Sequence, residues 1–62
     1  MKIGDIIKAH YSGSVYTLSR ITKERQGKKE VNIYHFVSEK SMPFSISEDN
    51  LRKEKSKNVF KW

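Results

Sequence analysis

The chain has 62 residues, of which 35% are apolar and none is cysteine, and it carries a net charge of +6. This length allows a single domain, residues 1–62, with a small core, and a chain without cysteine has neither a disulfide nor a thiolate metal site to stabilise it. No apolar run approaches the roughly 18 residues that span a membrane, and residues 1–5 lack the apolar stretch of a signal peptide. We therefore expect a cytoplasmic protein with no membrane partner.

The positive charge is concentrated near the end of the chain. Residues 52–62 contain five bases and one acid, a net +4, whereas the preceding residues contain eight bases and six acids, a net +2. A basic face suggests nucleic-acid binding, while a basic tail also fits ordinary solubility or an arm that docks on a partner.

Short runs of β-branched and aromatic residues, separated by turn residues, predict an all-β fold. Residues 6–11 alternate, with Ile7, Ala9 and Tyr11 on one face. Residues 15–22 predict a second strand, in which Ile21 breaks the alternation that begins at Tyr16. A β-bulge near Ser19 and Arg20 would explain this break.

The next residues predict a hairpin and two further strands. Residues 23–30 are polar and indicate a hairpin tip, with Gly27 as the residue of positive φ. Residues 31–37 carry large apolar groups on both faces, which is typical of a central strand. Residues 44–46 follow Pro43, which favours a strand at the edge of the sheet.

A short helical turn is expected at residues 47–52. Ser47 is a natural N-cap, and Glu48 and Asp49 suit the positive end of a first helical turn. The helix could extend to about residue 57, because the bases at positions 52, 53, 55 and 57 complement a C-terminal dipole. However, a longer helix would have almost no apolar stripe to bury, because Leu51 is the only apolar residue between positions 47 and 58.

The remaining residues are expected to form two segments. Residues 52–57 are interpreted as a basic connection. Residues 58–62, which contain Phe60 and Trp62, predict either a final strand or a tail that docks elsewhere.

Three stretches together resemble the small SH3-like barrel of KOW, Tudor and related domains. Residues 3–7 look like the hydrophobic-Gly-Asp-hydrophobic entry into the first strand, and residues 11–16 are similar to the following loop and second strand. Residues 44–51 are similar to the closing element, in which a Leu after an acidic turn plugs the barrel. The resemblance implies a mainly β, five-stranded SH3-like barrel.

The resemblance does not extend to a ligand. The residues after Gly13 depart from the KOW pattern, and the proline-peptide-binding motif of signalling SH3 domains is missing. The size and the richness in Lys, Ile, Ser and Asn suggest a free-standing accessory protein of bacterial or phage type.

Catalysis is not expected. His10 and His35 have no neighbouring Ser/Asp grouping and no metal-ligand spacing, and a helix N-terminus accounts for Glu48 and Asp49. The sequence contains no P-loop and no dinucleotide-binding fingerprint. We therefore expect a binding module without a cofactor or metal.

Nucleic acid is the first candidate partner, since bases could contact phosphates and exposed aromatic rings could stack on nucleobases. The candidate site comprises the hairpin tip (Lys23, Arg25, Lys28, Lys29), the C-terminal bases (Arg52, Lys53, Lys55, Lys57, Lys61) and the aromatic residues Tyr11, Tyr16, Tyr34 and Trp62. Interleaved Glu24, Glu30 and Glu54 reduce the charge of these groups, and Lys-rich loops are commonly only solvated surfaces that keep strand edges apart.

A protein partner is the alternative. A small barrel exposes strand edges and an aromatic groove, both of which are common docking surfaces. Such a protein would act as a small modulator of a host protein, as a monomer or weak homodimer. Trp62 would pack on its own barrel or insert into another chain.

Overall fold

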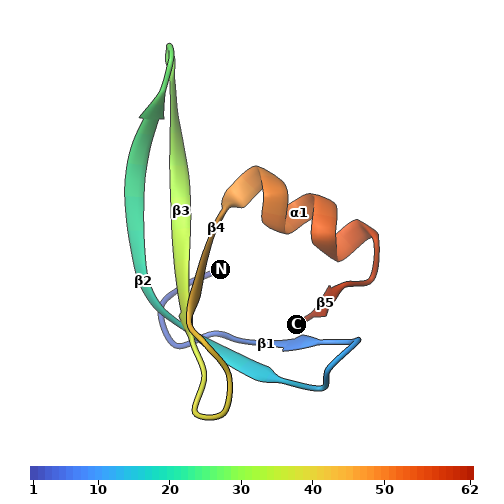
Figure 1. Ribbon diagram of the computed structural model, residues 1–62. Coiled ribbons are helices and arrows are strands. Elements are labelled where there is room, and N and C mark those ends of the chain that lie inside the picture. The colour runs from blue at the N-terminus through green and yellow to red at the C-terminus, as the bar shows by residue number, and fades with distance from the viewer.

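The computed structural model covers residues 1–62 and contains five strands and one helix (Figure 1). The elements in chain order are β1 (Ile6–Ala9), β2 (Val15–Gln26), β3 (Lys29–Val37), β4 (Phe44–Ser47), α1 (Glu48–Ser56) and β5 (Phe60–Lys61). The strands form one antiparallel sheet in the order β4-β3-β2-β1-β5, which curls into a half-barrel. This confirms the predicted small all-β SH3-like fold.

One face of the sheet forms the core, because alternate residues of each strand point to the inside of the curl. Its buried residues are Ile7, Ala9, Tyr16, Leu18, Tyr34, Phe36, Leu51 and Phe60. The two edge strands approach each other through side chains: the rings of Phe44 in β4 and Phe60 in β5 stack with their centroids 5.7 Å apart. Aromatic packing rather than a hydrogen-bond ladder therefore joins the two edges of the half-barrel.

A bulge in β2 changes which residues of its second half point toward the core. The register with β3 shifts between Leu18 and Arg20, as the break in the sequence pattern predicted. Because of the extra residue, Ile21 lies opposite Tyr34 and packs against the core instead of facing outward.

Strands β3 and β4 also follow the sequence pattern. β3 is paired on both sides, with β2 and β4, and β4 follows Pro43 at one edge of the sheet. The hairpin tip is shorter than the expected residues 23–30, because cross-strand pairing extends to Gln26 and Lys29. The chain turns through Gly27 and Lys28 alone, and Gly27 has φ of +64°. A side chain in that conformation is strained, which explains the glycine.

The helix is longer than the turn expected at residues 47–52. The Ser47 side chain accepts a hydrogen bond from the Asn50 N–H at 3.3 Å, so the predicted N-cap is confirmed, but α1 continues to Ser56. The interpretation of residues 52–57 as a connection was therefore wrong. One apolar residue suffices here, because α1 crosses the open side of the half-barrel and Leu51 alone points into the core, where it is only 2% exposed.

The chain turns sharply after α1 and enters β5. Asn58 has φ of +59°, the Asn58 N–H donates to the Lys55 carbonyl at 3.0 Å, and the Val59 N–H donates to the Glu54 carbonyl at 2.9 Å. These two bonds form the Schellman motif that commonly ends helices. The turn brings Phe60 opposite Ala9 of β1, so the final segment is a strand of the sheet rather than a free tail.

Only α1 is helical, and it has neither the length nor the apolar character needed to cross a membrane.

Candidate nucleic-acid interface

The hairpin of β2 and β3 projects from the half-barrel as a free two-stranded ribbon (Figure 1). Its four cross-strand pairs run from Lys23 opposite Asn32 to Gln26 opposite Lys29. Neither β1 nor β4 pairs with these residues, because β1 ends its pairing with β2 at Thr17 and β4 pairs with β3 only over residues 33–36. We call residues 23–32 the ribbon.

The bases of the ribbon are fully available to a ligand. Lys23, Arg25, Lys28 and Lys29 are all exposed, and the single ion pair of the protein lies elsewhere, between Arg52 and Glu48. Lys23 and Arg25 extend the core-side face of the sheet, whereas Lys29 lies on the outer face. The ribbon therefore presents positive charge on both faces and at its tip.

The helix carries the second group of bases. Glu48 accepts hydrogen bonds from Asn32 Nδ2 at 3.1 Å and from Arg52 at 2.7 Å, which ties the start of α1 to the base of the ribbon. The ammonium of Lys55 lies 4.2 Å from the ring centroid of Trp62, in cation–π contact. Lys53 and Lys57 are exposed near the helix C-terminus, where they complement the helix dipole.

The two groups of bases do not form one patch. α1 begins beside β4 and runs away from the hairpin, so Lys53, Lys55 and Lys57 lie toward its far end (Figure 1). The acidic first turn, Glu48 and Asp49, lies between these lysines and the ribbon. A polyanion that binds the ribbon would have to pass these two carboxylates to reach the helix.

Two of the candidate stacking residues are inaccessible. The side chains of Tyr16 and Tyr34 belong to the core, and the Tyr16 ring packs edge-on against Phe44 at 4.8 Å between centroids. Burial raises the pKa of Tyr34, and the nearby Glu48 carboxylate raises it further while Arg52 opposes this. Among the four rings considered, only Tyr11 and Trp62 remain exposed.

The structure also reveals a third group of bases, of which sequence reasoning placed Lys61 with the helix bases and left Lys8 and Arg20 outside the candidate site. Lys61 does not join the helix bases, because β5 places it directly opposite Lys8 of β1, on the outer face of the sheet. Arg20 lies on the same face, opposite His35. No sequence signal could identify this group, since it depends on which strands are neighbours.

His35 has a structural role, because both of its ring nitrogens form hydrogen bonds. Its Nε2 lies 2.7 Å from the hydroxyl of Thr22 and its Nδ1 lies 2.7 Å from the hydroxyl of Ser45, so the ring bridges β2, β3 and β4. No group of three His, Asp or Glu side chains comes together in a way that could hold a metal ion.

The chain matches no protein-family model, no curated protein and no solved structure. The geometry described above is therefore the basis for assigning a function.

Proposed function

We propose that this protein is a non-catalytic module that binds duplex DNA through its ribbon. The observation that supports this most strongly is a projecting two-stranded hairpin with four exposed bases, none of them held in an ion pair. Exposed bases without an internal partner remain free to replace the counterions that surround a phosphate backbone.

The dimensions of the ribbon support a duplex. Its four residue pairs extend over about 13 Å at roughly 3.3 Å per residue, and its two strands lie about 4.8 Å apart. The major groove of B-DNA is about 12 Å wide and admits a two-stranded ribbon. In that position Lys23 and Arg25 would face one groove wall and Lys29 the other.

The aromatic residues also favour a duplex over a single strand. Stacking on successive bases is the main source of single-strand affinity that does not depend on charge. With Tyr16 and Tyr34 in the core, that source is reduced to Tyr11 and Trp62. The binding that we propose is electrostatic and does not read the base sequence.

The test is the salt dependence of binding to a duplex oligonucleotide, measured by fluorescence anisotropy. Four phosphate contacts predict a slope of log K against log salt of about −3.6, at about −0.9 for each contact. A variant with Lys23, Arg25, Lys28 and Lys29 all changed to Gln is expected to lose most of this slope and of the affinity.

A matched control removes the same number of charges from the outer face of the sheet and from the loop after β3. Its substitutions are Lys8→Gln, Arg20→Gln, Lys40→Gln and Lys61→Gln. This variant should keep the slope of the original protein. Equal losses in the two variants would show that net charge alone drives binding, and an unshifted duplex at low salt would refute the proposal.

A further inference from the structure

We infer that the outer face of the sheet is a second binding surface, which docks an acidic peptide segment carrying an apolar anchor. This surface lies on the side of the sheet opposite the core. It is independent of the ribbon and of the proposed binding of DNA.

The centre of this surface is aliphatic and exposed. The strand register places Ile6, Thr17 and Val37 side by side across β1, β2 and β3, and Val15 is the next outward residue of β2. Ile6, Val15 and Val37 are 58%, 49% and 45% exposed, respectively. Three neighbouring aliphatic side chains are thus left in water, although the opposite face of the same strands is packed.

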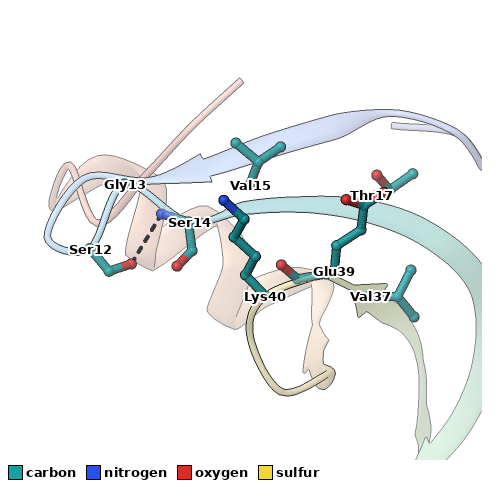
Figure 2. Close-up of a pocket in the computed structure, with 9 residues that line it drawn as sticks. Ser12, Gly13, Ser14, Val15, Thr17, Val37, Glu39 and Lys40 are labelled. Atoms are coloured by element: carbon teal, nitrogen blue, oxygen red, sulfur yellow. Dashed lines mark hydrogen bonds between the residues drawn. The ribbon is translucent and has the colours of Figure 1, made fainter.

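A pocket of about 570 Å³ opens beside this apolar row (Figure 2). Val15, Thr17 and Val37 line it on the sheet, and the loops after β1 and after β3 form its walls. The hydroxyls of Ser14 and Ser41 lie 3.0 Å apart and link the two loops. This contact joins the two walls of the pocket, whose loop residues are polar, while Val15 and Val37 supply an apolar floor on which an apolar side chain can pack.

Bases surround the apolar row. Lys8 lies next to Val15 and opposite Lys61, and Arg20 follows beyond the bulge. Figure 2 shows Lys40 reaching from the loop after β3 toward Ser14 and Val15. An apolar centre that excludes water, inside a charged rim, is the arrangement found at binding hot spots.

The pairing of Lys8 with Lys61 destabilises the fold when no ligand is bound. Like charges directly opposite each other on neighbouring strands are destabilising. No carboxylate of the protein forms an ion pair with either lysine. An acidic ligand would relieve this repulsion, which is the charge complementarity that identifies the occupant.

Other occupants fit this surface less well. A second copy would bring the same lysines against one another. A nucleic-acid backbone carries a negative charge on every phosphate, so the Glu39 carboxylate that also lines the pocket would repel it. Such a backbone also has no aliphatic group that could pack against Val15 and Val37. A peptide can place its carboxylates at the lysines and an apolar side chain in the pocket.

The experiment is selection from a display library of random peptides, followed by titration of the enriched peptides into the isotopically labelled protein. We expect sequences with clustered Asp and Glu around a large apolar residue, and chemical-shift changes in β1, in the first half of β2 and at the end of β3. A Lys8→Glu, Lys61→Glu variant should bind these peptides at least tenfold more weakly, and so should a Val15→Ser, Val37→Ser variant.

Two comparisons separate this inference from folding effects and from the proposed DNA binding. Lys61→Glu alone places a negative charge opposite Lys8, so it should raise the melting temperature while it weakens binding of the peptide. The variant with four Gln substitutions in the ribbon should bind the peptides like the original protein. Enriched peptides without acidic bias, shifts confined to the ribbon, or shifts of the outer face by duplex DNA alone would overturn the inference.

Discussion

The ribbon and the C-terminal segment have the same net charge but different roles in the fold. The ribbon, residues 23–32, contains four bases and two acids, and residues 48–62 contain five bases and three acids, so each carries a net +2. The first stretch has no buried residue, whereas the second supplies Leu51 and Phe60 to the core. Net charge therefore does not distinguish a free arm from a structural element. The difference lies in one or two apolar residues that reach the core, here Leu51 and Phe60.

The strongest test of this comparison is deletion of residues 58–62. The truncated chain loses the pairing of β5 with β1 and the stacking of Phe60 on Phe44. Burial of a Phe contributes about 3–5 kcal/mol, which approaches the total of about 3–9 kcal/mol expected for a domain of this size. We expect an unfolded chain by circular dichroism.

The matched control is Trp62→Ala, which keeps β5. It removes a partly exposed ring whose contact with Lys55 is a cation–π interaction worth about 0.5–1 kcal/mol. This variant should still melt cooperatively, at a temperature about 2–8 °C lower. Cooperative folding of the truncated chain would instead mean that the segment is a free docking arm.

Leu51→Ala is expected to destabilise the protein less than the deletion of residues 58–62 does. Leu51 is the single buried residue of α1, so its truncation should cost about 2–5 kcal/mol in the free energy of unfolding. Lys53→Ala, on the exposed side of the same helix, should change it by no more than about 0.5 kcal/mol. Chemical denaturation measures both, and similar values for the two variants would show that α1 does not depend on Leu51 for its position.

The smallest effect on global stability is expected in the ribbon. Gly27→Ala has space for the new methyl group, with no atom within 4 Å, but φ of +64° costs about 1–2 kcal/mol for a residue with Cβ. Since the ribbon can open without exposing the core, we expect faster amide hydrogen exchange at residues 23–32 and little change elsewhere. Gly27→Asn should have a weaker effect, because Asn tolerates this conformation. A uniform acceleration throughout the sheet would contradict the independence of the ribbon.

The sequence by itself determined most of the local structure. The break at Ile21, the glycine at position 27 and the N-cap at Ser47 each predicted a feature that the structure contains. The alternation of residues 6–11 predicted the first strand, but this strand ends at Ala9 and Tyr11 is exposed. These signals are local, because pleating, positive φ and capping involve residues that are close in the chain. The four bases of the ribbon could be identified in the same way.

Only the tertiary structure decided which side chains are available to a partner. Tyr16 and Tyr34 have polar tips and could have been exposed, but the curl of the sheet places both in the core. α1 packs on the half-barrel through Leu51 alone, because the open side of the half-barrel receives this side chain, and a single apolar residue forms no periodic pattern. Lys61 lies opposite Lys8 and away from the helix bases, because β5 pairs with β1 from the other end of the chain. Such contacts depend on which strands are neighbours, and a one-dimensional pattern does not contain that information.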